Sequence, residues 1–133
     1  MEDVVKKYLK GSESRDRFKL YHKTKIHGPF YAIDIDLALV EFGRGIVCFL
    51  DSKKGMDSIS DTEFEAYDDI IKKGYKVGIV HFDNNDELDN GNFSIYKYVN
   101  RSKLQHIIDT ANWEEFAKWE LEIRQKYRDN QSL

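Results

Sequence analysis

Residues 45–53 of this 133-residue chain read Gly-Ile-Val-Cys-Phe-Leu-Asp-Ser-Lys, an apolar run that ends in Asp51 and Lys53. The run is rich in the β-branched and aromatic residues that are typical of a buried strand. Residues two apart on a strand point to the same face, so we expect the Asp51 carboxylate and the Lys53 amine to lie side by side. This stretch therefore guides both the fold prediction and the functional hypothesis.

A second segment of alternating apolar and polar residues, 30–40, precedes this run and predicts another strand. Gly43-Arg44-Gly45 predicts the turn that joins the two strands as a hairpin. With the turn at this point, Asp36 falls opposite Asp51, which predicts Cβ atoms about 5 Å apart. Asp34 shares the face of Asp36. Two carboxylates this close suit a shared divalent cation.

A helix and a further strand are predicted after the hairpin. Ser60-Asp-Thr-Glu63 is a capping box, and Gly74 marks the end of the helix that it opens. Lys76–Phe82 has the composition of a buried strand. A strand-helix-strand connection of this kind favours parallel pairing with the 45–53 strand, and the sheet is therefore predicted to be mixed.

The remaining elements complete a compact domain. Asn90-Gly91 is a hairpin-turn signal, after which residues 92–99 predict an edge strand. Asn112 is predicted to cap a C-terminal helix over residues 112–128. We predict one α/β domain over residues 1–133, in which helices flank a mixed central sheet, with a core at 30–99 and a helical N-terminal segment at 1–28.

Length and composition limit the class of protein. A chain of 133 residues fits one domain, and its longest apolar runs fall short of the roughly 18 residues that a membrane span needs. The N-terminus lacks the basic-then-apolar order of a signal peptide, which predicts an intracellular, cytoplasmic location. Cys48 is the only cysteine and lies within the apolar run, so we expect a buried, reduced thiol.

Charge is distributed unevenly along the chain. Residues 1–28 carry eight Lys/Arg and four Asp/Glu, whereas residues 29–95 carry six and fourteen. A basic segment beside an acidic one suits a protein that contacts phosphate with one part and a metal with the other, although solvated helix faces are an alternative interpretation. The predicted nucleic-acid-binding residues are Lys6, Lys7, Lys10, Arg15, Arg17, Lys19, Lys23 and Lys25.

An acid on the first strand and Asp-x-Lys on the second, followed by a helix and a strand, resemble the PD-(D/E)xK nuclease superfamily, which includes restriction-endonuclease-like and Holliday-junction-resolvase-like proteins. The resemblance implies an αβββαβ core. It implies Mg²⁺ or Mn²⁺ bound by Asp36 and Asp51, with the Ser52 backbone carbonyl as an auxiliary ligand, and Lys53 as the group that orients or deprotonates the attacking water. Asp34 is an alternative ligand.

The chain departs from the family pattern at several positions. Ile35 stands where the family often has proline before the first acid. Some members carry Gln-x-x-x-Tyr on the following helix, and Glu63 to Tyr67 matches only at the tyrosine. From the residues alone, we expect Glu63 to be a capping residue and Tyr67 to be a core residue. The resemblance to the family makes both residues candidates for auxiliary roles in the active site. Glu13 is the candidate for the acid that some members place on an N-terminal helix.

The functional hypothesis is a metal-dependent nuclease that hydrolyses phosphodiester bonds in DNA through Asp36, Asp51 and Lys53. One alternative is a module with the same fold that has lost its chemistry and binds nucleic acid or protein. Another is a different α/β fold in which Asp34 and Asp36 serve phosphoryl transfer. The four histidines form no metal-ligand spacing and are interpreted as structural or surface residues. Whether two copies form a homodimer stays open.

Overall fold

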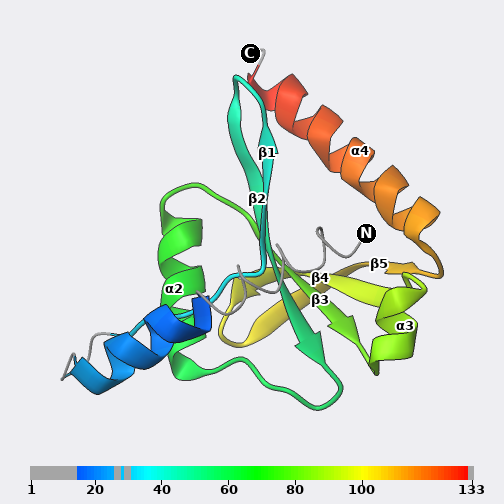
Figure 1. The fold of residues 1–133 in the computed structure, drawn as a ribbon. Coiled ribbons are helices and arrows are strands. Elements are labelled where there is room, and N and C mark those ends of the chain that lie inside the picture. Colours follow the sequence, from blue (N-terminus) through cyan, green and yellow to red (C-terminus); the bar gives the residue numbers. More distant parts are fainter. Residues whose placement is uncertain (1–14, 26–27, 29–30, 132–133) are drawn as a thin grey trace, which may run out of the picture. The chain divides into compact units, whose positions relative to one another are not determined.

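The computed structural model describes residues 15–25, 28 and 31–131. The chain forms two compact units, Met1–Asp34 and Ile35–Leu133, and the second contains the whole sheet. Over the described residues the protein is an α/β fold with one five-stranded mixed sheet and four helices (Figure 1). The predicted α/β class with a mixed sheet flanked by helices is therefore confirmed.

The sheet has the strand order β1-β2-β3-β4-β5. Strands β2 and β3 are parallel, and all other neighbouring pairs are antiparallel. The strand bounds are Leu37–Glu41 for β1, Gly45–Lys54 for β2, Val77–Phe82 for β3, Phe93–Asn100 for β4 and Lys103–Thr110 for β5.

The predicted hairpin is present, because β1 pairs with β2 in a register that sets Leu37 against Leu50. The predicted strand over 30–40 was too long, since residues 31–36 lie outside the sheet and β1 begins at Leu37. The reason is local: the Asp36 carboxylate accepts the backbone N–H of Ser52 at 2.8 Å. A side chain thus takes the donor that a longer β1 would have paired, and the ladder ends there.

Helix α2 (Asp61–Lys72) connects β2 to β3 as predicted. Both halves of the capping box form, with Glu63 N donating to Ser60 Oγ at 3.2 Å and Ser60 N donating to Glu63 Oε1 at 3.0 Å. Gly74 follows the helix at φ 93°, a conformation that glycine adopts without strain. In the described residues, two strands precede this crossover helix, one fewer than the αβββαβ core implied by the resemblance.

The region after β3 differs from the prediction. A short helix, α3 (Asn85–Asp89), precedes Asn90-Gly91, and the strand predicted at 92–99 is not an edge strand. It is β4, and β5 covers its outer side. We did not predict β5, because most of its residues are exposed on both faces of the sheet and its sequence therefore lacks the alternation that reveals a half-buried strand.

Helix α4 (Trp113–Gln131) forms where a C-terminal helix was predicted, and Asn112 Oδ1 accepts the N–H of Glu115 at 2.9 Å. Helices α2 and α4 cover opposite faces of the sheet (Figure 1). The side chains of β2 alternate between the two hydrophobic clusters: Cys48 and Leu50 pack in the cluster that includes Trp119 of α4. Phe49 packs in the cluster that includes Tyr67 of α2.

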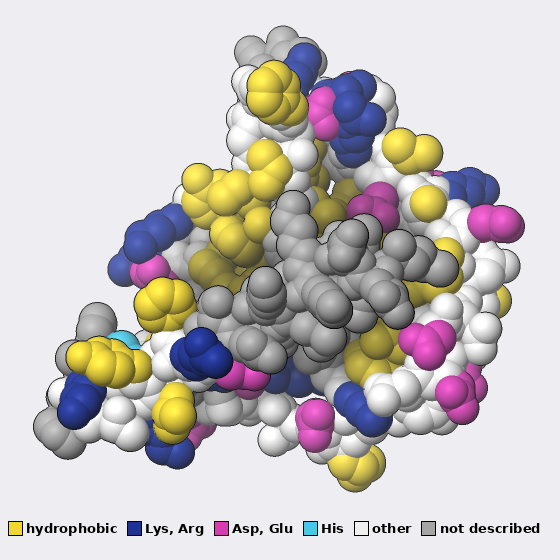
Figure 2. Space-filling model, in the orientation of Figure 1, with side chains coloured by type: hydrophobic (Ala, Val, Ile, Leu, Met, Phe, Trp, Pro, Cys, Tyr) yellow, Lys and Arg dark blue, Asp and Glu magenta, His cyan; other side chains and the backbone are white. Residues whose placement is uncertain are grey.

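Glu41, at the end of β1, connects the hairpin to α4. Its carboxylate receives hydrogen bonds from Arg124 and Arg128, including Arg128 Nε at 2.9 Å. These guanidinium groups lower the pKa of Glu41 to about 2. Figure 2 shows hydrophobic and basic side chains together at the outer end of the hairpin and of α4, where Phe42 is fully exposed.

The N-terminal unit contributes a helix over residues 15–25. Within this unit, Asp34 accepts a hydrogen bond from Lys19 Nζ at 2.8 Å and lies 3.7 Å from Arg15 Nε. In the part of the chain that the structure describes, we find no helix with the length and apolar character required to cross a membrane.

Candidate active site

Asp51 and Lys53 lie on the face of β2 that α2 covers. The apolar run before Asp51 carries this carboxylate into the interior, where the residue is only 4% exposed. Lys53, two positions later, is half-buried and shares its face. The predicted juxtaposition of acid and amine on one strand is therefore present.

Asp36 lies beside Asp51, as the hairpin register predicted. Its carboxylate accepts hydrogen bonds from the backbone N–H and from the hydroxyl of Ser52. It also interacts with the Asp51 carboxyl, both by charge and by hydrogen bonding. The two acids therefore converge although Asp36 precedes the first residue of β1.

The surroundings of Asp51 disfavour its charged form. The pKa of Asp51 is raised to about 6, chiefly by burial and also by the neighbouring Asp36 carboxylate. A hydrogen bond from the Tyr67 hydroxyl and the charge of Lys53 act in the opposite direction. A buried carboxylate next to a second carboxylate requires compensating positive charge if both are to be ionised. This pair is therefore suited to a cation.

Two residues of α2 hold the acid and the amine of β2. Tyr67 is fully buried, and its hydroxyl donates to Asp51 Oδ2 while lying 3.3 Å from Glu63 Oε2. Burial and the two carboxylates raise the pKa of Tyr67, so the phenol keeps its proton. Lys53 Nζ donates to Glu63 Oε2 at 2.6 Å. Four side chains thus form a chain of contacts in the order Lys53, Glu63, Tyr67, Asp51.

Glu63 has two roles, which sequence reasoning had treated as alternatives. One oxygen, Oε1, caps α2 through Ser60 N, and the other, Oε2, receives the Lys53 ammonium. Burial alone would raise the pKa of Glu63, but Lys53 and the Ser60 amide outweigh it and hold the pKa below its usual value. Tyr67 is likewise a core residue and a partner of Asp51. Both auxiliary candidates therefore contact the predicted site.

His81 is a neighbour of the site that sequence reasoning did not identify. It is the register partner of Lys53 on the adjacent parallel strand, so both side chains project from the same face of the sheet. The His81 ring nitrogen Nε2 lies 2.7 Å from the Gly55 carbonyl oxygen, which fixes the ring beside the end of β2. In the sequence, this proximity was indicated only by the position of His81 in a predicted buried strand that pairs with the strand carrying Asp51 and Lys53.

The residues present fit a hard divalent cation. Asp36 and Asp51 offer carboxylate oxygens, and the Ser52 carbonyl between Asp51 and Lys53 remains a predicted third ligand. Among the residues that the structure describes, no group of three or more His, Cys, Asp or Glu side chains forms a metal cluster. Mg²⁺ is commonly held by one or two carboxylates with water and substrate oxygens completing its shell, so two acids are sufficient.

The other predicted residues belong to the N-terminal unit. Asp34, the alternative ligand, forms ion pairs with Lys19 and Arg15 in the N-terminal unit. Five of the predicted nucleic-acid-binding residues are exposed on the 15–25 helix: Arg15, Arg17, Lys19, Lys23 and Lys25. The predictions for Lys6, Lys7, Lys10 and Glu13 lie outside the described residues.

Comparison of the chain with protein-family models, with curated proteins and with solved structures gave no match.

Proposed function

We propose that this protein is a metal-dependent nuclease that hydrolyses phosphodiester bonds in DNA. One observation carries the proposal: Asp36 and Asp51 converge at the end of a hairpin, and Lys53 projects from the same face two residues later. Two acids and an amine in this arrangement suit the binding of a divalent ion and of an attacking water near a phosphate.

The arrangement of elements agrees with the PD-(D/E)xK resemblance in its central part. Asp51 and Lys53 lie on the second strand of a hairpin, Asp36 directly precedes its first strand, and a capped helix then leads to a parallel strand. We propose that this hairpin, α2 and β3 are the counterpart of the nuclease core, with one strand fewer before the helix than the αβββαβ order.

In this mechanism Asp36, Asp51 and the Ser52 carbonyl would hold Mg²⁺ or Mn²⁺. When bound, the ion would supply positive charge that offsets the negative charge of the phosphodiester. Lys53 donates one hydrogen bond to Glu63, and an ammonium group has three N–H donors. The two remaining donors are available to orient the attacking water and to contact a phosphate oxygen. Tyr67 keeps the Asp51 carboxylate in place through its hydroxyl.

DNA is the proposed substrate because the chain supplies basic residues outside the acidic site. Arg17, Lys23 and Lys25 are exposed on the 15–25 helix and suit phosphate contacts, which position a nucleic acid without specifying its sequence. Association of two copies as a homodimer stays a prediction.

The decisive experiment is incubation of plasmid, linear and single-stranded DNA with Mg²⁺ or Mn²⁺. Asp51→Asn and Lys53→Met are expected to lower the cleavage rate by at least about 100-fold. Lys54→Met is the matched control, because Lys54 is exposed and adjacent in sequence. Cleavage that survives Lys53→Met, or that Lys54→Met removes equally, would contradict the assignment.

A module without catalytic activity is a second candidate, because Lys53 is already paired with Glu63 and all four side chains of the site have partners. Calorimetric titration with Mn²⁺ separates the two. A nuclease is expected to bind the ion in a manner that Asp51→Asn abolishes, whereas DNA binding that is identical with and without Mn²⁺, in the absence of cleavage, would favour the binding module.

A further inference from the structure

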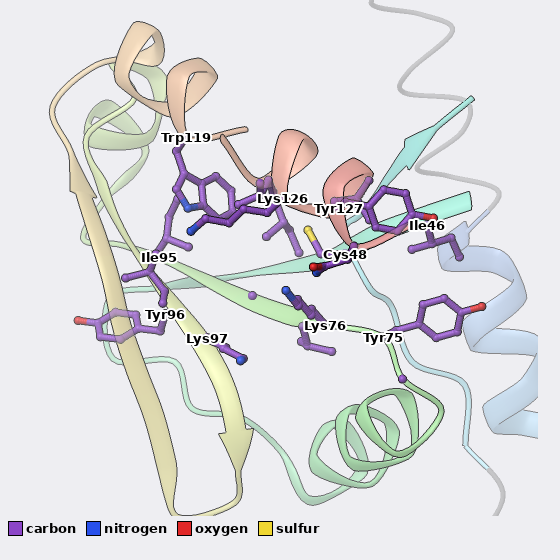
Figure 3. A pocket seen from close by; sticks show the side chains of 18 of the residues that line it. Ile46, Cys48, Tyr75, Lys76, Ile95, Tyr96, Lys97, Trp119, Lys126 and Tyr127 are labelled. Atoms are coloured by element: carbon purple, nitrogen blue, oxygen red, sulfur yellow. The ribbon is translucent and has the colours of Figure 1, made fainter. Parts of the chain in front are cut away.

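A cavity of about 800 Å³ lies on the face of the sheet opposite the candidate active site. Its floor includes Cys48, Leu50 and Ile95, which belong to the hydrophobic cluster on the α4 side of the sheet. Figure 3 shows Trp119 and Tyr127 reaching into it from α4. Ligand sites in proteins commonly have volumes of roughly 300–1,000 Å³, so the cavity has room for a ligand.

Basic side chains outnumber acidic ones around this cavity, where Glu120 of α4 lies near enough to Cys48 to raise the pKa of its thiol. The lining residues include Arg44, Lys76, Lys97 and Lys126 and no Asp or Glu. All four are exposed, and the three lysines form no ion pair with any residue that the structure describes. Figure 3 shows these lysines reaching the cavity from the residue before β3, from β4 and from α4. Three ammonium groups that line one cavity without an ion pair among the described residues favour an anionic ligand.

Aromatic side chains lie between the cations. Tyr75 lies at the rim of the cavity, is 43% exposed, and its ring meets the Phe49 ring edge-on. Tyr127 donates its hydroxyl to the Arg44 carbonyl at 2.8 Å, which fixes the ring of this residue. Basic side chains that alternate with fixed aromatic rings are the arrangement with which proteins bind single-stranded nucleic acid, where phosphates meet cations and bases stack on rings.

We propose that this cavity binds single-stranded DNA, one or a few nucleotides at a time. Lys76, Lys97 and Lys126 would contact backbone phosphates, and Tyr75 would stack on a base. A base-paired helix does not fit, because its bases are enclosed by two backbones and cannot reach a cavity floor. The link between this binding and strand cleavage rests on the proposed function, but the binding itself does not.

Fluorescence anisotropy with a labelled oligothymidylate, in EDTA, measures binding without cleavage. Binding to single strands weakens with salt by about 0.7 in the logarithmic slope for each phosphate neutralised, so the triple variant Lys76→Gln, Lys97→Gln, Lys126→Gln is expected to lose about 2 from this slope. Tyr75→Ala is expected to weaken binding by about tenfold. The matched control removes three exposed lysines outside the cavity: Lys72→Gln, Lys103→Gln and Lys118→Gln.

An unchanged slope in the cavity variant, or an equal loss in the control, would overturn the proposal. Binding of a polyglutamate peptide in place of the oligonucleotide, dependent on the same lysines, would also overturn it. Circular dichroism of both triple variants shows whether the fold is retained. If the oligonucleotide binds through the cavity lysines but DNA is not cleaved, only the proposed nuclease function is refuted. If DNA is cleaved but oligonucleotide binding does not depend on the cavity lysines, only the present inference is refuted.

Discussion

Asp51→Asn is expected to make the protein more stable above pH 6 when divalent cations are absent. The pKa of Asp51 rises from 3.8 to about 6 in the folded state, so the folded protein binds this proton more tightly than the unfolded chain. Wild-type stability therefore falls as pH rises from about 4 to 6. A shift of about two units corresponds to about 3 kcal/mol, which is the upper limit of what the neutral amide recovers.

The asparagine suits the site in other respects. Its carbonyl oxygen accepts from Tyr67, and its amide faces the Asp36 carboxylate, so neither polar group is buried without a partner. Urea unfolding, followed by tryptophan fluorescence in EDTA between pH 4 and pH 8, measures the difference. We expect a gain of about 1–3 kcal/mol at pH 8 that vanishes near pH 4. Asp57→Asn, at an exposed acid, is the control.

A variant that is no more stable than wild type at pH 8, or a difference that is independent of pH, would refute the reasoning. Addition of Mg²⁺ extends the test. Ligand at about 100 times its dissociation constant adds about 2.7 kcal/mol of stability. This gain is expected in the wild type alone, because the variant lacks one of the two carboxylates.

Three further predictions concern the framework of the site. Glu63→Gln retains the cap of α2 but removes the carboxylate from Lys53, so the rate of DNA cleavage is expected to change while the free energy of unfolding shifts by less than about 1 kcal/mol. Glu63→Ala also loses the cap and is expected to lower the free energy of unfolding by about 1–2 kcal/mol. A larger loss of stability in the glutamine variant than in the alanine variant would contradict this prediction. Glu41→Gln is expected to lower the melting temperature at pH 7. The depressed pKa of the Glu41 carboxyl stabilises the wild type above about pH 4.5, and this stabilisation is lost as the pH falls towards 2. A difference in melting temperature between variant and wild type that is equal at pH 7 and pH 2 would oppose this prediction. Gly91→Ala is expected to destabilise the fold far more than Gly43→Ala in denaturant titrations. Both glycines have a positive φ, but of the two only Gly91 has backbone in the way of an added Cβ, at 2.4 Å. Equal losses in the free energy of unfolding would show that φ alone matters.

The sequence predicted those elements whose signals are local. The capping box at Ser60 and the apolar run before Asp51 depend on neighbouring residues alone, and both predictions are confirmed. β5 could not be predicted in this way, because an exposed strand is stabilised mainly by backbone pairing with β4, which leaves no pattern in its side chains. The length of β1 was wrong because Asp36 replaces backbone pairing with a side-chain hydrogen bond.

In the candidate site, too, some features could be predicted from the sequence and others depend on tertiary packing. The pairing of Asp36 with Asp51 was predicted from the turn position, but the hairpin reaches this register through a one-residue shift between Leu39 and Val40 that the sequence did not reveal. The contacts of Glu63 and Tyr67 with the strand depend on how α2 docks on the sheet, which is a tertiary property that spacing along the chain does not specify. The cavity on the opposite face of the sheet could not be foreseen, because its lysines come from the residue before β3, from β4 and from α4.

The alternation of side chains along β2 limits how this gene can change. Cys48 and Leu50 point to one side of the sheet, and Phe49, Asp51 and Lys53 to the other. Gain or loss of a single codon within this strand would turn the acid and the amine away from their partners and place leucine among them. Length variation among descendants of this chain should therefore accumulate in the turn before Gly45 or in the connection that precedes Ser60, and should spare the strand itself.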